Sequence, residues 1–152
     1  MYRMCYDILF IKYGVKWGFD FLMYESYTRQ ALPNKNYREL LGSAICVFNA
    51  NNAFIVENIL RNDCEQCYTW HNLIDLTSGQ LKKSIQATIT ENAGLEIPTL
   101  FEDLVNRRNR IIHNFQFTDL DGEQRLATKE KSGNQFTITE EYLLDFINDN
   151  QR

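Results

Sequence analysis

The sequence lacks the features that mark membrane and secreted proteins. No apolar run reaches the ~18 residues that are needed to span a bilayer, so we expect no membrane partner. Asp7, Lys12 and Lys16 interrupt the apolar stretch near the N-terminus, which is unlike the core of a signal peptide. The four cysteines are unevenly spaced, which is typical of free thiols in a reducing compartment. These absences predict a cytoplasmic protein.

The sequence also lacks an excess of positive charge. Its formal net charge of −4 argues against a protein that coats nucleic acid electrostatically. We find no glycine-rich phosphate loop, nucleophile elbow or paired carboxylates. Against this background, Arg107, Arg108 and Arg110 concentrate positive charge in one short stretch, which favours a focused phosphate site.

Aromatic residues are plentiful, and 152 residues are enough for one domain with a core that needs no staples. Residues 1–36 form an aromatic N-terminal segment that we expect to pack on the rest of the chain or on a partner. Within it, apolar residues alternate from Ile11 to Met23, which favours a strand, and the interleaved glycines disfavour a helix. Pro33 and Asn34 then interrupt the pattern.

Residues 37–152 read as a single, mainly helical domain. The apolar spacing predicts helices over Tyr37–Arg61, over Ser78–Glu91 and from Thr99 onward, with residues 63–70 as a polar connection. In the third helix the core face is predicted to be Leu100, Leu104, Ile111 and Phe115. This pattern predicts an up-and-down helical bundle.

A small β-hairpin is predicted before the last helix. The strands Gln124–Lys131 and Gln135–Ile138 flank a glycine-bearing turn, Ser132-Gly133-Asn134. Thr139 then caps a final helix over Glu140–Asn148.

The most informative segment is Arg108-Asn109-Arg110-Ile111-Ile112-His113, near the end of the third helix. At 100° per residue, Asn109 and His113 lie about 40° apart, whereas Arg108 lies about 140° from His113. On a single helix, Asn109 and His113 therefore share one face, and the arginine lies outside that face. Two such helices across a two-fold axis would enclose one cleft with both pairs, so the spacing favours a homodimer.

This segment resembles the signature of the HEPN superfamily: an arginine, a polar residue that is often asparagine, three further residues and a histidine. The likeness covers residues 37–148, but its specific part is these six residues. It implies a homodimeric, metal-independent endoribonuclease without cofactors, of the kind found in toxin–antitoxin or phage-defence systems, with an antitoxin protein as a further partner.

The resemblance also implies roles for individual residues. His113 would activate the ribose 2′-hydroxyl or protonate the leaving 5′-oxygen. Arg108 would stabilise the transition state, and Asn109 would orient the phosphate or His113. The products would be a 2′,3′-cyclic phosphate and a 5′-hydroxyl. The local concentration of positive charge separately predicts that Arg107 and Arg110 bind the RNA. The alternative is a catalytically silent bundle that serves dimerisation or partner binding.

Cys64, Cys67 and His71 are weaker candidates, as three zinc ligands. A fourth ligand would have to come from Cys5 or Cys46 through the fold. A single Cys-x-x-Cys is also common in plain loops, and we therefore predict no metal centre.

Overall fold

The computed structural model describes residues 27–152, apart from the side chains of residues 91 and 92. The chain divides into two compact units, Met1–Leu32 and Pro33–Arg152, close to the boundary drawn from the sequence at residue 36. The strand predicted over Ile11–Met23 lies outside the described residues, as does the packing of the N-terminal aromatic segment.

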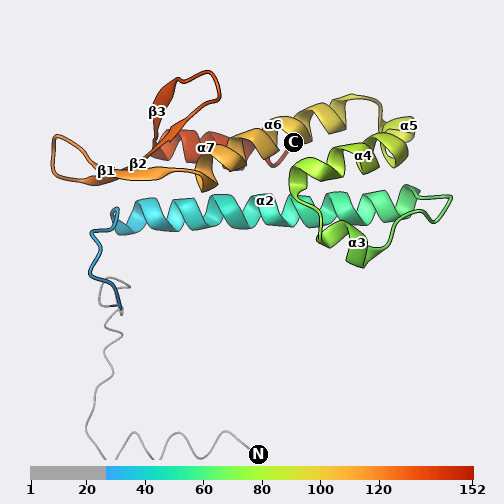
Figure 1. Cartoon of the computed structure of the whole chain (residues 1–152), viewed down its shortest axis with the longest axis horizontal. Coiled ribbons are helices and arrows are strands. Elements are labelled where there is room, and N and C mark those ends of the chain that lie inside the picture. The colour runs from blue at the N-terminus through green and yellow to red at the C-terminus, as the bar shows by residue number, and fades with distance from the viewer. Residues whose placement is uncertain (1–26) are drawn as a thin grey trace, which may run out of the picture. The chain divides into compact units, whose positions relative to one another are not determined.

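The second unit is mainly helical and carries a small three-stranded antiparallel sheet, as Figure 1 shows. Its elements, in chain order, are α2 (Lys35–Asn62), α3 (Trp70–Ile74), the 3-10 helix η2 (Ser78–Leu81), α4 (Lys82–Thr88), α5 (Thr90–Ala93), α6 (Glu96–Ile112), β1 (Phe115–Thr118), β2 (Gln124–Lys129), β3 (Gln135–Ile138) and α7 (Glu140–Asp149). The predicted mainly helical class is therefore confirmed.

Helix α2 is the central element, and α4, α6 and α7 lie along one side of it while α3 lies on the other (Figure 1). It begins where the side chain of Asn34 accepts a hydrogen bond from the backbone N–H of Tyr37. By length and composition α2 is long and apolar enough to cross a membrane, although the sequence contains no uninterrupted apolar run of that length. A core helix passes the same test, and Phe48, Val56 and Ile59 on α2 are buried in the protein core.

Helix α7 is fastened to α2 at both ends. The Tyr37 hydroxyl donates to the backbone carbonyl of Ile138, just before α7, at 2.7 Å. At the other end, the Asn51 amide donates to the backbone carbonyl of Asn150 at 2.7 Å. Thr139 caps α7 as predicted, because its hydroxyl accepts from the backbone N–H of Tyr142.

Between these bonds lies an aromatic core. The ring of Phe48 on α2 stacks with Phe101 of α6 and with Phe146 of α7, at centroid distances of 6.3 and 6.2 Å. Phe48 and Phe146 are completely buried. This cluster fixes α2, α6 and α7 relative to one another, and α6 carries the arginine–histidine segment.

Several local predictions need correction. The helix predicted over Ser78–Glu91 is divided into η2, α4 and α5, and the short helix α3 lies next to the predicted polar connection. Helix α6 begins at Glu96 rather than Thr99, since proline is tolerated in a first helical turn, where Pro98 lies.

The prediction that Phe115 lies on the core face of the third helix is wrong. The helix ends at Ile112, and Phe115 begins strand β1, where it pairs with Ala127 and is exposed. The predicted hairpin is confirmed as β2 and β3, with Gly133 at φ 97° in its turn. Strand β1 extends that hairpin to a three-stranded sheet in the order β1-β2-β3.

Candidate functional site

His113 lies at the junction where α6 ends and the sheet begins. Its backbone N–H still donates to the carbonyl of Asn109 at 2.9 Å, but its φ and ψ of −94° and 49° are no longer helical. The side chain is exposed, and among residues 27–152 it has no hydrogen-bond or ion-pair partner. Within the described residues, nothing therefore occupies the imidazole, and a ligand can reach it.

Arg108 reaches from α6 toward α2. Its guanidinium carbon lies 5.3 Å from the centroid of the Phe48 ring, within the range of a cation–π contact. The same guanidinium donates from Nη1 to Oδ1 of Asn109 at 3.0 Å. The arginine is half-buried, and within the described residues no carboxylate neutralises it. Its position is thus set by an aromatic ring of the core and by an amide.

The structure brings Arg108 and Asn109 together through their side chains. His113 is joined to Asn109 only through the backbone, and within the described residues no hydrogen bond links its imidazole to Arg108. Asn109 also borders a cavity of about 140 Å³ between α6 and η2.

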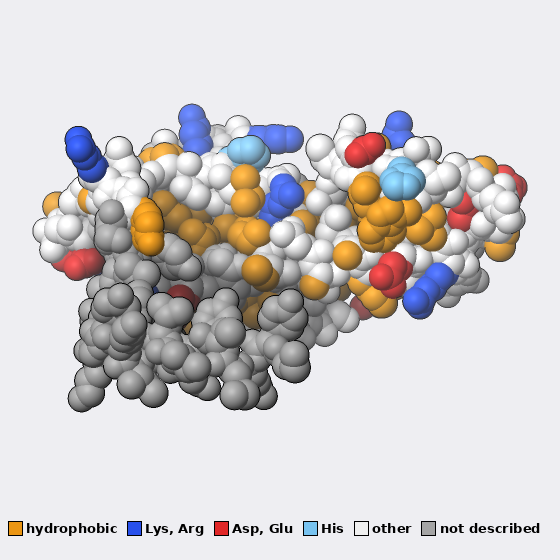
Figure 2. Space-filling model, turned by 90° about the horizontal axis from the view of Figure 1, so that it is seen from below, with side chains coloured by type: hydrophobic (Ala, Val, Ile, Leu, Met, Phe, Trp, Pro, Cys, Tyr) orange, Lys and Arg blue, Asp and Glu red, His pale blue; other side chains and the backbone are white. Residues whose placement is uncertain are grey.

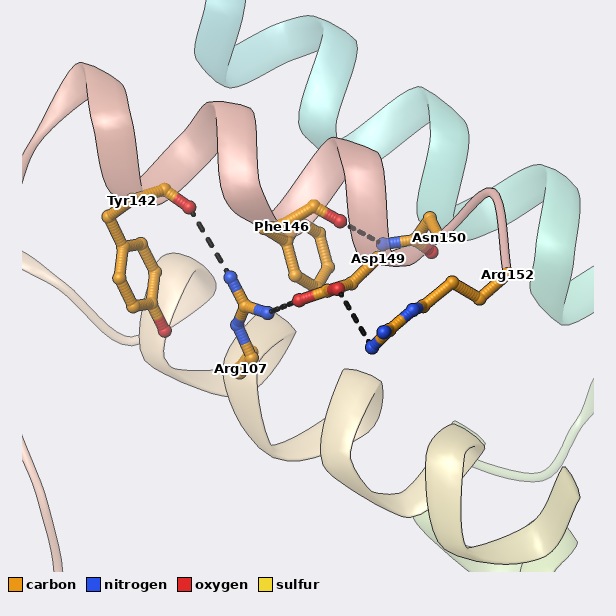
Figure 3. A network of polar contacts seen from close by, with 6 residues as sticks. All are labelled: Arg107, Tyr142, Phe146, Asp149, Asn150 and Arg152. Carbon is orange, nitrogen blue, oxygen red and sulfur yellow. Dashed lines mark hydrogen bonds and ion pairs between the residues drawn. The ribbon is translucent and has the colours of Figure 1, made fainter. Parts of the chain in front are cut away.

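Arg107 has a different environment from Arg108. It forms an ion pair with Asp149 of α7, and its guanidinium carbon lies 5.3 Å from the Tyr142 ring and 5.4 Å from the Phe146 ring (Figure 3). Nη2 also reaches the backbone carbonyl of Tyr142 at 3.5 Å. With its side chain only 19% exposed, Arg107 holds α7 to α6. Its predicted contact with RNA stays a prediction.

Arg110 borders a larger cleft between α6, the β2–β3 hairpin and α7, with a volume of about 510 Å³. Its guanidinium donates to the backbone carbonyl of Lys129 at the end of β2. Phe136 and Tyr142 also line the cleft, and their ring centroids lie 5.5 Å apart. Burial raises the pKa of the Tyr142 phenol above its ordinary value, although Arg107 acts in the opposite direction.

Sequence reasoning did not identify the aromatic side of this cleft. Phe136 was assigned to a strand and Tyr142 to a helix, each for its apolar character. The available signal was the short separation of hairpin and last helix, which places residues of β3 and the first turn of α7 near one another.

The candidate zinc ligands do not form a site in the described part of the chain. No group of three or more His, Cys, Asp or Glu side chains there could hold a metal ion, and Cys5 lies outside it. Lost hydration, followed by the carboxylates of Asp63 and Glu65, raises the pKa of the Cys67 thiol, which disfavours the thiolate that zinc requires.

Hydrophobic side chains lie on both sides of His113 in the sequence. Ile112 and Phe115 are each 46% exposed. Figure 2 shows hydrophobic side chains at several places on one face of the molecule, where both histidines of the chain also reach the surface, well apart. The sequence around His113 therefore combines an ionisable group with exposed apolar area.

Comparison of the chain with profiles of known protein families, with curated proteins and with solved structures finds no match in any of the three.

Proposed function

We propose that this protein is a metal-independent endoribonuclease of HEPN type that cleaves single-stranded RNA in the cytoplasm. The observation that carries the proposal is the arrangement at the end of α6. A half-buried arginine is held by Phe48 and Asn109, and an exposed histidine follows within five residues. A fixed cation and an accessible proton carrier are the groups that metal-free phosphodiester cleavage needs.

The reaction would be an internal transfer at phosphorus. The ribose 2′-oxygen attacks the adjacent phosphorus and forms a P–O2′ bond, while the P–O5′ bond breaks. The His113 imidazole accepts the proton of the 2′-hydroxyl, and the imidazolium that forms donates a proton to the leaving 5′-oxygen, which gives a 2′,3′-cyclic phosphate and a 5′-hydroxyl. The Arg108 guanidinium would stabilise the negative charge on the equatorial phosphate oxygens.

We propose that the active protein is a homodimer. Ideal helix geometry sets Arg108 about 140° from His113, so a second copy would place an arginine and a histidine beside one phosphate. Ile112 and Phe115 supply exposed apolar area next to His113, which supports a contact at this place. A ribonuclease of this kind would act in a toxin–antitoxin or phage-defence setting, with an antitoxin protein that covers the site.

The first test is cleavage of single-stranded RNA by the purified protein in EDTA. Arg108→Ala and His113→Ala are each expected to reduce the rate by at least about 100-fold. Arg61→Ala is the matched control, because Arg61 is an exposed arginine at the far end of α2. Equal cleavage by the wild type and the Arg108→Ala, His113→Ala double variant would assign the activity to another site or to a contaminant.

The dimer is tested by light scattering and by the dependence of the rate on protein concentration. Phe115→Asp is expected to give monomers with an intact fold and little cleavage, because a charge would be placed in the contact. A monomeric wild type that cleaves RNA at a rate proportional to its concentration would contradict the composite site. A folded dimer without cleavage would support the silent-bundle alternative.

A further inference from the structure

The cleft between α6, the β2–β3 hairpin and α7 has the composition of a nucleotide site. Its volume of about 510 Å³ falls within the ~300–1,000 Å³ of typical small-ligand sites. One side is aromatic, formed by Phe136 and Tyr142, and the other side is polar, formed by α6. An aromatic side with a polar side is what a base needs, since every base has a π face and a hydrogen-bonding edge.

On the aromatic side, Phe136 and Tyr142 leave ring surface open to a ligand instead of covering one another completely. Phe136 and Tyr142 are inclined at 52° to one another and both are only half-buried, so part of each ring faces the open cleft. The Arg107 guanidinium lies against the Tyr142 ring, where Asp149 neutralises it. Phe136 is therefore the side chain that offers a free stacking surface.

The polar side offers unused hydrogen-bonding groups. Asp103 and Asn106 lie one turn apart on α6, line the cleft and are exposed. Within the described residues neither side chain has a hydrogen-bond or ion-pair partner. A carboxylate accepts hydrogen bonds and an amide both donates and accepts, so the pair can contact the edge of a base.

The charge of the cleft favours one nucleotide over a long polyanion. Arg110 and Lys131 carry positive charge at its rim, while Asp103 and Glu130 offset it. Such a balance gives little non-specific attraction for RNA and leaves two cations for a single phosphate. Arg110 is held in place by the carbonyl of Lys129.

One residue that borders the cleft is close to His113 in the sequence. Arg110 lies in the last turn of α6, three positions before His113, the C-cap residue of the helix. A nucleotide in the cleft would thus be adjacent to the phosphate that His113 acts on.

We propose that this cleft binds one nucleotide of single-stranded RNA beside the cleaved bond, with the base stacked on Phe136 and a phosphate held by Arg110 and Lys131. The assignment deepens the proposed function and rests on it for its place beside the reacting phosphate. It makes Phe136 and Lys131 binding residues that act on substrate affinity.

The test measures binding separately from cleavage. All variants carry His113→Ala, and a fluorescein-labelled single-stranded RNA is titrated by anisotropy. Phe136→Leu, which keeps apolar volume but loses the ring, is expected to weaken binding roughly 5- to 100-fold. Lys131→Gln is expected to weaken binding and to lower the salt slope by about 0.7. Phe54→Leu and Arg61→Gln are the controls, since both residues are exposed on α2.

The possible outcomes distinguish the subsite from the ribonuclease. If Phe136→Leu and Lys131→Gln bind RNA as their parent does, or if the parent binds none, the subsite is overturned. If the parent binds RNA through these residues while the protein with His113 intact does not cleave, the subsite stands and the ribonuclease fails. In the cleaving protein, Phe136→Leu is expected to raise KM and to leave kcat unchanged, whereas a structural defect would lower both.

Discussion

Two adjacent arginines on α6 have opposite environments. Arg107 reaches toward α7 and meets the carboxylate of Asp149 between two aromatic rings. Arg108 reaches toward α2, where it meets the ring of Phe48 and the amide of Asn109. The first guanidinium is neutralised by a partner, and the second is positioned without being neutralised.

Under the proposed function, this difference separates a residue that stabilises the fold from one that takes part in the reaction. A charge paired with a carboxylate contributes to the α6–α7 contact but has little attraction left for a phosphate. A charge held only by a π face and an amide oxygen keeps its full charge, in a fixed position. Neighbouring residues of the same type can thus have different functions because the helix turns by 100° between them.

The largest effect on stability is expected at Phe146, which contacts both Arg107 and the ring that lies under Arg108. Phe146 stacks on Phe48 and also carries Arg107 on its ring. Phe146→Ala should lower the free energy of unfolding by about 3–5 kcal/mol, because a fully buried ring leaves a cavity. Chemical denaturation measures this loss. Exposed Leu144→Ala on the same helix is the control and should change stability by less than about 1 kcal/mol. Equal effects would mean that α7 is not packed as described.

The next prediction concerns the chemistry of the unpaired arginine. Arg108→Lys keeps the charge but loses the fork and the flat face, so the cleavage rate should fall by about 100-fold, which corresponds to ~2.7 kcal/mol. Initial rates on one RNA substrate measure this, with Arg61→Lys as the control. An unchanged rate would show that the position needs only positive charge, or none at all.

A smaller effect on stability should distinguish Arg107, which is paired with a carboxylate, from Arg108. Arg107→Ala removes a partly buried ion pair and two ring contacts, so the free energy of unfolding should fall by about 2 kcal/mol. Arg108→Ala loses one ring contact and one half-buried hydrogen bond to Asn109 but, among residues 27–152, no ion pair, and should cost about 1 kcal/mol. Urea denaturation of the two variants side by side measures the difference. A larger loss of stability for Arg108→Ala than for Arg107→Ala would contradict the assignment of Arg107 as the arginine that stabilises the fold.

The smallest effect is expected at the bond between Tyr37 and Ile138. Tyr37→Phe leaves a carbonyl unsatisfied and should lower stability by about 1 kcal/mol near neutral pH. Burial raises the pKa of Tyr37 from 10.0 to about 12. A raised pKa stabilises the fold fully below pH 10, and this contribution disappears as the pH rises toward 12.

The difference between wild type and Tyr37→Phe should therefore narrow between pH 10 and pH 12. Because every other tyrosine is the same in both proteins, subtracting the two stability curves isolates this one hydroxyl. A constant difference across that range would contradict a tyrosine that stays neutral in the fold.

Much of the fold could be predicted from local patterns. The apolar spacing of α2 and the cap at Thr139 are local, and both were predicted within one or two residues. Strand β1 was missed because its few residues continue the apolar spacing of α6, and only pairing with β2 makes them a strand. The small helix α3 has too few residues for a periodic signal.

The candidate site could be predicted only in part, for a similar reason. The angle between Arg108 and His113 follows from helix geometry alone. The ring under Arg108 belongs to α2, sixty positions earlier in the chain, and the carboxylate on Arg107 belongs to α7. Such partners are set by the packing of helices, which no local pattern contains. The cleft at Phe136 likewise exists only once the hairpin lies against α6 and α7.

The fastening of α7 to α2 has a consequence for the order of folding. Its bonds join positions that are 101 and 99 residues apart, so they close very long loops of the chain. Contacts of that span form late, because the entropy of loop closure must be overcome before they contribute.

During synthesis, α6 leaves the ribosome well before α7. Until Phe146 has been synthesised, the ring of Phe48 lacks one of its two stacking partners. The Arg108 guanidinium then lies on a ring whose own position is not yet fixed. The nascent chain therefore carries Arg108 before the aromatic core that positions it is complete. The proposed cleavage of RNA would therefore begin only after α7 has been made.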